Sequence, residues 1–228
     1  MIVVFEKGFV LRHIGHLDLM RTIQRALRRT NLPIRYSNGF NPHIQLSFAA
    51  PLSVGVVGMR EVMDVPIEGD CDGLTFTQEL NRVLPGCLRV RFSRAVPDDY
   101  PTLMALVAGS RIRIEMEGGE TADLVATAFH TFMDHDECVT LRKTKSGENM
   151  TNIRPFVEEA TIEKSENGYT IRCLIRNQKE GSLKPSVFMQ ALCEVAAVAN
   201  VDYIAYRDQI LARNQKGQLI ALEEYAYA

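Results

Sequence analysis

The chain has 228 residues and a formal net charge of -2, and 46% of its residues are hydrophobic and 24% charged. This is the composition of an ordinary folded protein, so it excludes wholesale disorder. The most apolar window, residues 48–59, is broken by a proline and two glycines, and charges at positions 6 and 7 interrupt the N-terminal apolar run. We therefore predict neither a membrane-spanning helix nor a signal peptide, and we expect a cytoplasmic protein with no membrane partner.

The first part of the chain reads as alternating strands and helices. Helical spacing of apolar residues predicts a helix over 16–30, which Pro33 ends. The other predicted elements are a strand at 2–6, extended pieces at 33–37 and 44–49, a strand at 60–67, a helix at 72–84 and a strand at 87–95. This βαββαβ order is the ferredoxin-like order.

The pattern then starts again. The predicted elements are a strand at 110–117, a helix at 121–134, a strand at 138–144, irregular chain at 145–156, a hairpin at 159–176, a helix at 186–198 and a strand at 200–207. We therefore predict an α+β protein with two tandem ferredoxin-like (βαββαβ) domains. Their expected bounds are 1–97 and 110–210, with a connector at 98–109 and a C-terminal tail at 211–228.

The predicted helix at 16–30 carries a one-sided set of arginines. Arg21, Arg25, Arg28 and Arg29 fall within about a quarter-turn, opposite the apolar face. Between residues 7 and 60 the chain has eight Lys or Arg and one acid, Asp18. Like charges four residues apart cost stability, and a bound polyanion would relieve that cost. Because guanidinium groups grip phosphate, we predict an RNA-backbone site. An acidic protein surface or plain solvation would also accommodate these charges.

Two turns flank this helix. His13 and His16 lie at its entry, and Asp18 in the first turn suits the positive end of the helix dipole. After the helix, Gly39 is expected to take a positive φ and Pro42 to stiffen the turn. Aromatic rings in this turn could stack on bases. Besides the four arginines, the candidate RNA-binding residues are Arg12, Tyr36, Phe40, Asn41 and His43.

The histidines raise the question of catalysis. His13, His16 and His43 are candidates for acid–base work, because imidazole titrates near neutral pH. H-x-x-H alone is a weak zinc signature, and the five scattered cysteines form no C-x-x-C pair. We therefore expect no metal site, no disulfide framework, no iron–sulfur cluster and no other cofactor.

Residues 8–56, GFVLRHIGHLDLMRTIQRALRRTNLPIRYSNGFNPHIQLSFAAPLSVGV, resemble the radical SAM-associated (radical SAM-linked) protein family, a domain-of-unknown-function group. LMALVAG, NIRPF and SLKPSVFMQAL are similar to further landmarks of that family. The resemblance implies a stand-alone domain, or one fused behind a radical SAM enzyme, and supplies no reaction. This chain lacks C-x-x-x-C-x-x-C, so any radical chemistry would belong to a partner enzyme.

Our leading expectation is a non-catalytic accessory protein of a radical SAM enzyme that binds tRNA or rRNA through the arginine face. One alternative is a metal-independent endoribonuclease with His16 or His13 as general base. That alternative rests on architectural similarity to the CRISPR repeat-processing endoribonucleases, and fold alone does not carry function. The other alternative is a protein–protein adaptor that binds no RNA.

Overall fold

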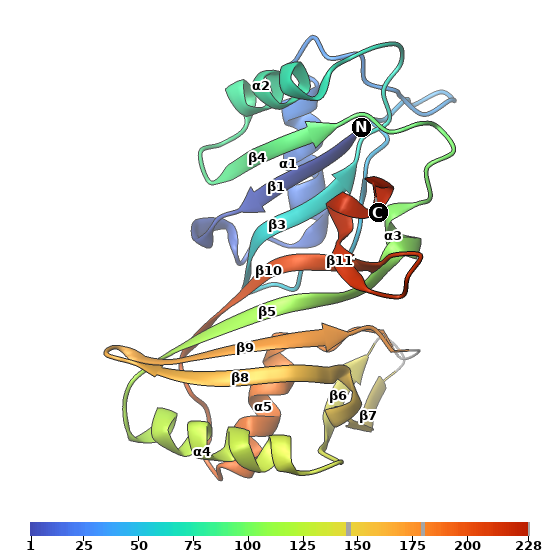
Figure 1. The fold of residues 1–228 in the computed structure, drawn as a ribbon. Helices are drawn as coiled ribbons and strands as arrows, with labels where there is room; N and C mark the ends of the chain where they lie inside the picture. The colour runs from blue at the N-terminus through green and yellow to red at the C-terminus, as the bar shows by residue number, and fades with distance from the viewer. Residues whose placement is uncertain (145–146, 179–180, 228) are drawn as a thin grey trace. The chain divides into compact units, whose positions relative to one another are not determined.

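The computed structural model describes residues 1–144, 147–178 and 181–227, and it has an α+β fold (Figure 1). The chain divides into two compact units. The first unit contains residues 1–108 and 207–228, and the second unit contains residues 109–206. The chain passes between the units within two strands, β5 (Val107–Glu117) and β10 (Tyr203–Arg213).

The sheet of the first unit is built around β1, which pairs antiparallel with both β3 and β4. A short strand, β2, pairs with the end of β3 through Ser47 and Asp64. The elements of this unit are β1 (Ile2–Lys7), η1 (Phe9–Leu11), α1 (His16–Leu27), β2 (Ser47–Phe48), β3 (Val56–Asp64), α2 (Gly73–Val83), β4 (Leu88–Arg94), α3 (Leu103–Leu106), β11 (Leu219–Ala221) and η3 (Leu222–Tyr227). Residues 207–213 of β10 follow β3 in the strand order.

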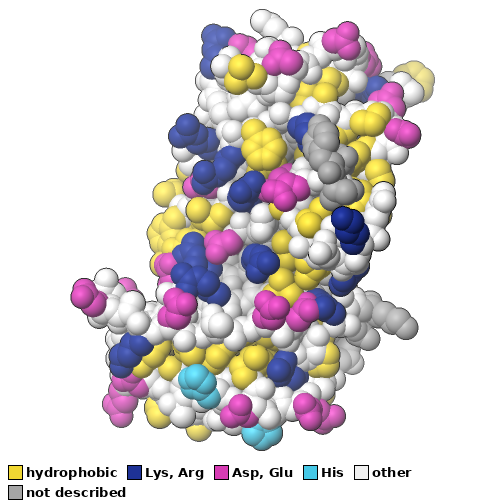
Figure 2. Space-filling view, in the orientation of Figure 1, with side chains coloured by type: hydrophobic (Ala, Val, Ile, Leu, Met, Phe, Trp, Pro, Cys, Tyr) yellow, Lys and Arg dark blue, Asp and Glu magenta, His cyan; other side chains and the backbone are white. Residues whose placement is uncertain are grey.

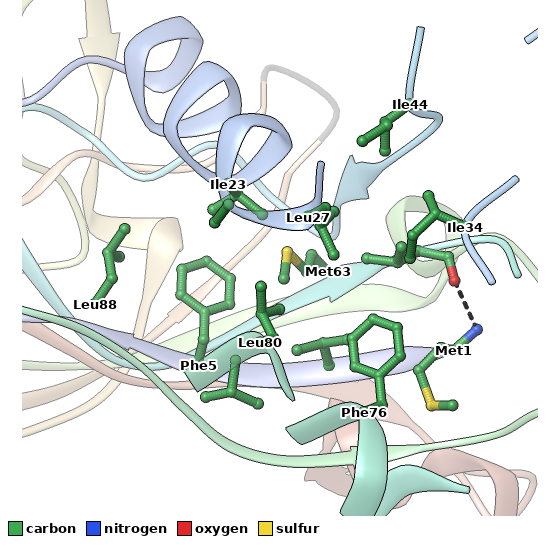
Figure 3. Close-up of a cluster of buried hydrophobic side chains, with 14 of the residues drawn as sticks. Met1, Phe5, Ile23, Leu27, Ile34, Ile44, Met63, Phe76, Leu80 and Leu88 are labelled. Atoms are coloured by element: carbon green, nitrogen blue, oxygen red, sulfur yellow. Dashed lines mark hydrogen bonds between the residues drawn. The ribbon is translucent and has the colours of Figure 1, made fainter. Parts of the chain in front are cut away.

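Helices α1 and α2 cover one face of this sheet. Figure 3 shows Ile23 and Leu27 of α1 and Leu80 of α2 converging on Phe5 of β1. All four side chains are at most 2% exposed. Because α1 is amphipathic and buries this side, its opposite side must face outward.

The other face of the same sheet is also covered. Ile2 and Val4 pack in a second cluster with Leu103 of α3, Ile210 of β10 and Leu222 of η3. Residues 207–228, which we expected to end the second domain and form a tail, therefore belong to the first unit. The burial of apolar side chains such as Ile210 against this face accounts for the placement.

The second unit combines antiparallel strands with two packed helices. Strand β9 pairs with β5 on one side and β8 on the other, and Phe132 of α4 packs against Phe188 of α5 with ring centroids 5.2 Å apart. Residues 203–206 of β10 complete the unit. The remaining elements are α4 (Glu120–Asp134), β6 (Val139–Thr144), β7 (Gly147–Asn152), η2 (Arg154–Phe156), β8 (Val157–Ser165), β9 (Gly168–Arg176) and α5 (Pro185–Val195).

Three sequence-based expectations are wrong in detail. The segment expected to be irregular contains β7, which gains its hydrogen bonds by pairing with β6; residues 145–146 of that segment lie outside the described residues. The helix expected over 16–30 ends at Leu27, with Arg28 as its C-cap, whereas the extended piece expected at 33–37 is present and makes two isolated bridges. Strand β10 continues to Arg213 instead of ending at 207, because residues 210–212 are all buried.

Candidate functional site

The arginine face of α1 points outward because the other side of the helix packs in the hydrophobic core. Leu19, Ile23, Ala26 and Leu27 are buried. Arg21 and Arg25 lie on the opposite side of the helix, Arg28 is its C-cap and Arg29 is the residue after it; all four are exposed. The helix begins at His16 after an N-cap glycine, and Asp18 is the acid of its first turn.

The four arginines differ in how they are held. Arg21 forms an ion pair with Asp18 at 3.4 Å. The guanidinium of Arg29 donates a hydrogen bond to the backbone carbonyl of Val83, at the end of α2. The guanidinium groups of Arg25 and Arg28 have no hydrogen-bond or ion-pair partner among the described residues. These two are therefore the free cations of the face.

The loop that follows the helix is closed at its base. Ser37 donates its amide hydrogen to the His43 carbonyl at 2.9 Å, and the His43 amide donates to Ser37 Oγ at 3.1 Å. Ser37 Oγ also lies 2.7 Å from His43 Nδ1. Between these residues Gly39 adopts a φ of +121°, a conformation that residues with a Cβ atom rarely adopt. The side chain of Phe40 is fully exposed at 106% of its reference area.

A hydrogen bond joins this loop to α1. Gln24 Nε2 donates to the backbone carbonyl of Ile44 at 3.0 Å. Gln24 follows Arg21 by three residues and precedes Arg28 by four, so the three share one side of the helix. The loop therefore borders the arginine face. Helix α1 lies behind the sheet in Figure 1, and the face of the first unit seen in Figure 2 instead mixes Lys and Arg with Asp and Glu.

The turn before the helix holds its predicted site residues in different ways. The Arg12 guanidinium stacks 3.7 Å from the Phe9 ring centroid and donates to the Phe9 carbonyl at 3.2 Å. His13 is exposed. His16 is half-buried, with its ring edge against Phe48 at a centroid distance of 5.0 Å.

No catalytic arrangement joins the three histidines. Within the described part of the chain, none of them forms a hydrogen bond or an ion pair with another histidine or a carboxylate. Ser37 and His43 resemble a nucleophile and its base, but the same serine oxygen accepts the His43 amide and closes the loop. Among the described residues, no three His, Cys, Asp or Glu side chains gather as a possible metal site.

Sequence reasoning missed a buried lysine beneath this region. Lys7, at the end of β1, is 1% exposed. Its Nζ donates to the carbonyls of Ile14 at 2.9 Å and Arg12 at 3.3 Å, so it fixes the turn before α1 from inside. Burial lowers the pKa of Lys7; the nearby charge of Glu61 opposes this effect and that of Arg207 adds to it. Strand alternation, which places Lys7 in phase with Val3 and Phe5, was the available signal.

Glu61 and Arg207 form a buried ion pair in the same unit. Arg207 Nε donates to Glu61 Oε1 at 2.8 Å, and both residues are less than 10% exposed. Arg207 also donates to the carbonyls of Ala50 at 3.1 Å and Pro51 at 3.2 Å. The pair therefore ties β10 to β3 and to the segment before it.

An open cleft of about 750 Å³ lies elsewhere on the first unit, and none of the predicted site residues lines it. Its lining includes Asp70, Asp72 and Glu79, with Arg82 as the basic residue. Asp72 is the N-cap of α2 and accepts a hydrogen bond from the Thr75 amide at 2.9 Å. This acidic lining would repel a polyanion, so the cleft and the arginine face are suited to different ligands.

Comparison with known proteins places the chain in a family. Residues 1–185 match the model of a family described as "Uncharacterized protein conserved in bacteria (DUF2344)", and the chain belongs to this family. The match carries no indication of a radical SAM partner. The sequence matches none of the curated proteins with which it was compared. Among the described residues, no helix has the length and apolar character needed to cross a membrane.

Two solved structures show distant similarity. One is a protein assigned as a glycine cleavage system transcriptional repressor, with 13% identity, a TM-score of 0.22, and coverage of 90% of this chain and 94% of that chain. The other is an unknown protein from Galdieria sulphuraria, with 14% identity, a TM-score of 0.25, and coverage of 90% and 96%. With scores this low, neither likeness supports an argument about fold or function.

Proposed function

We propose that this protein binds RNA through the arginine face of α1 and acts in the cytoplasm as a non-catalytic accessory protein of a radical SAM enzyme. The observation that carries the RNA proposal is the pair of free guanidinium groups of Arg25, on the exposed side of α1, and Arg28, the C-cap of the same helix. Their repulsion is unfavourable in the isolated protein. Phosphate groups bound at the two guanidinium groups would relieve this repulsion, and its relief would add to the free energy of binding.

The neighbouring arginines can join such a site at small cost. The pair between Arg21 and Asp18 is exposed and 3.4 Å long, and such pairs contribute little to stability. Arg21 also offsets the charge of Asp18, the acid of the first turn, which would otherwise repel a phosphate at this face. Guanidinium binds phosphate with two parallel hydrogen bonds, so a tRNA or rRNA backbone is a suitable ligand.

Reversal of the free charges tests the proposal. The double variant Arg25→Glu, Arg28→Glu should bind RNA more weakly, and its binding should depend less steeply on salt. Loss of two phosphate contacts reduces the slope of log K against log salt by about 1.4 for a single strand. Arg111→Glu is a matched control, because Arg111 is an exposed arginine of β5 in the second unit. An unchanged affinity and slope in the double variant would refute the proposal.

The partner enzyme is proposed from the sequence resemblance. A radical SAM enzyme from the same organism, co-expressed with this protein, should form a complex with it after nuclease treatment. The iron–sulfur cluster would be bound by the enzyme, since the five cysteines of this chain are separate free thiols. If none of the organism's radical SAM enzymes formed a complex with this protein, this part of the proposal would be refuted.

An adaptor role without RNA has one observation in its favour. Phe9, Val10 and Val54 are 45%, 77% and 62% exposed. The turns that carry them are joined by the hydrogen bond from the Gly55 amide to the Arg12 carbonyl at 2.8 Å. Exposed apolar side chains on adjoining turns are typical of protein contacts. If Val10→Asp abolished the enzyme complex and the protein bound no RNA, the adaptor role would replace the RNA proposal.

We also propose that each unit is a ferredoxin-like domain. In the first unit the strand order β4-β1-β3, with β2 beyond β3, supports this assignment. In the second unit the order β10-β5-β9-β8 supports it in the same way, with the β6–β7 hairpin as an insertion. An experimental structure that gave a different strand order in either unit would refute it.

A further inference from the structure

The aromatic loop beside α1 presents a ring to solvent. Tyr36 and Ile44 form a bridge at its base, and the Ser37–His43 hydrogen bonds close it above that bridge. The tip is left with five residues, 38–42. Phe40 stands on this tip with its side chain fully exposed, and no other large hydrophobic side chain in the described residues is as exposed.

This ring does nothing for the fold. A phenylalanine stabilises a fold when its ring is buried away from water, and the ring of Phe40 is fully exposed. The loop is nevertheless fixed: its base is closed by hydrogen bonds, and Gln24 of α1 holds its end through the Ile44 carbonyl at 3.0 Å. The ring is therefore carried on a restrained support next to the helix side that bears Arg21 and Arg28.

Guanidinium groups and an exposed ring contact different parts of a nucleic acid. The arginines suit phosphates, which duplex and single-stranded RNA both offer. The ring suits the face of a base, which only an unpaired and unstacked nucleotide offers. An arginine face acting alone would bind a duplex at least as well as a single strand, because a duplex has the higher charge density.

We infer that this site selects unpaired RNA, a single strand or the loop of a hairpin, by stacking a base on Phe40 while the α1 arginines hold the backbone. This inference rests on the proposed RNA binding and adds the class of RNA that is bound. Tyr36, 42% exposed at the base of the same loop, offers a second ring for a neighbouring base.

The test compares two RNAs at one salt concentration: a labelled oligouridylate, whose bases stack weakly on one another, and the same strand annealed to oligoadenylate. We expect the wild-type protein to prefer the single strand. Phe40→Ala should weaken single-strand binding by about 5- to 100-fold and leave duplex binding and the salt slope unchanged. Phe40→Tyr should retain single-strand binding. Leu74→Ala is the matched control, because Leu74 lies on α2 and is 68% exposed.

The outcomes separate the two proposals. Equal binding of both RNAs, or no effect of Phe40→Ala on the single strand, would overturn the inference; the proposed function would stand if Arg25→Glu, Arg28→Glu still reduced binding. No binding of either RNA by the wild-type protein would overturn the proposed function itself. A preference for the duplex would show that charge alone determines affinity, and it would also overturn the inference.

Discussion

Lys7 and Ile14 are joined by a hydrogen bond of 2.9 Å from the lysine Nζ to the backbone carbonyl. The lysine reaches this carbonyl from the end of β1 while its side chain is 1% exposed. The turn that leads into α1 is thus held by a cation that solvent does not reach. The position of Arg12 and the start of the arginine face depend on a residue that no ligand touches.

Replacement of this lysine should destabilise the first unit. Lys7→Met keeps a similar length but removes the donors to the Arg12 and Ile14 carbonyls. The Arg12 carbonyl still accepts from the Gly55 amide, whereas the Ile14 carbonyl loses its donor, and a buried acceptor without a partner costs about 1–3 kcal/mol. We expect the free energy of unfolding in urea to fall by about that amount. A variant as stable as the wild type would show that the turn is fixed by other contacts.

The same variant reveals a pH dependence. The folded pKa of Lys7 is depressed below its ordinary value of 10.5, chiefly by burial. Between the folded pKa and 10.5, the unfolded chain holds a proton that the folded chain has released, so stability rises with pH. The free energy of unfolding of the wild type should therefore increase relative to that of Lys7→Met as the pH rises toward 10.5. The difference should decrease as the pH falls through the folded pKa of Lys7. Urea titrations at neutral and alkaline pH measure it; an advantage that falls with rising pH would contradict the prediction.

The buried ion pair should matter far more than an exposed one. Arg207→Met leaves the Glu61 carboxylate buried without its guanidinium partner, which typically costs about 3–5 kcal/mol. Arg82→Met removes the exposed pair with Glu79, 2.8 Å long, and should cost less than about 1 kcal/mol. Urea unfolding of both variants gives the comparison. Equal losses would mean that burial of the Glu61–Arg207 pair has no energetic consequence.

The loop conformation can be tested at Gly39. A Cβ added there meets no atom within 4 Å, so Gly39→Ala introduces backbone strain at φ +121° and no clash. Strain of this kind costs about 1–3 kcal/mol. Gly86→Ala is the control, since a Cβ there also meets nothing within 4 Å and Gly86 has no positive φ. Thermal denaturation should show a loss only for Gly39→Ala.

The endoribonuclease alternative predicts that the protein cleaves RNA, whereas our proposal predicts that it does not. Labelled RNA incubated with the protein in a chelator should remain intact, because His13, His16 and His43 have no carboxylate to orient them in the described structure. Gel analysis over time measures this directly. Cleavage that disappears in His16→Ala or His13→Ala would establish the endoribonuclease role instead.

The sequence predicted much of the fold where one local rule decided the structure. Helix α2 follows its N-cap Asp72, and the β8–β9 hairpin, predicted at 159–176, turns at Glu166 and Asn167. Strand β7 could not be predicted, because its polar residues form a strand only through pairing with β6. The length of β10 was missed for a related reason: its last residues are buried by strands far away in the sequence.

The same division applies to the candidate site. Helical periodicity predicted that the four arginines would be exposed together, and they are, although α1 ends at Leu27, before Arg28 and Arg29. It could not separate Arg25 and Arg28 from Arg29, because the partner of Arg29 is a carbonyl at the end of α2. The link from Gln24 to the loop is also a tertiary contact and has no local signature.

The return of residues 207–228 to the first unit has a consequence for synthesis of the chain. While a ribosome makes the second unit, the first unit has its strands β1 and β3 but not the segment that covers Ile2 and Val4. Leu103 of α3 is already present to pack on that face, but Ile210 and Leu222 are missing until β10 and η3 emerge, so the nascent protein exposes part of an apolar sheet surface during this interval. Closure then requires contacts of Ile2 and Val4 with residues far away in the sequence, such as Ile210, and such long-range contacts form slowly. The first unit should accordingly need chaperone protection until translation of this region has finished.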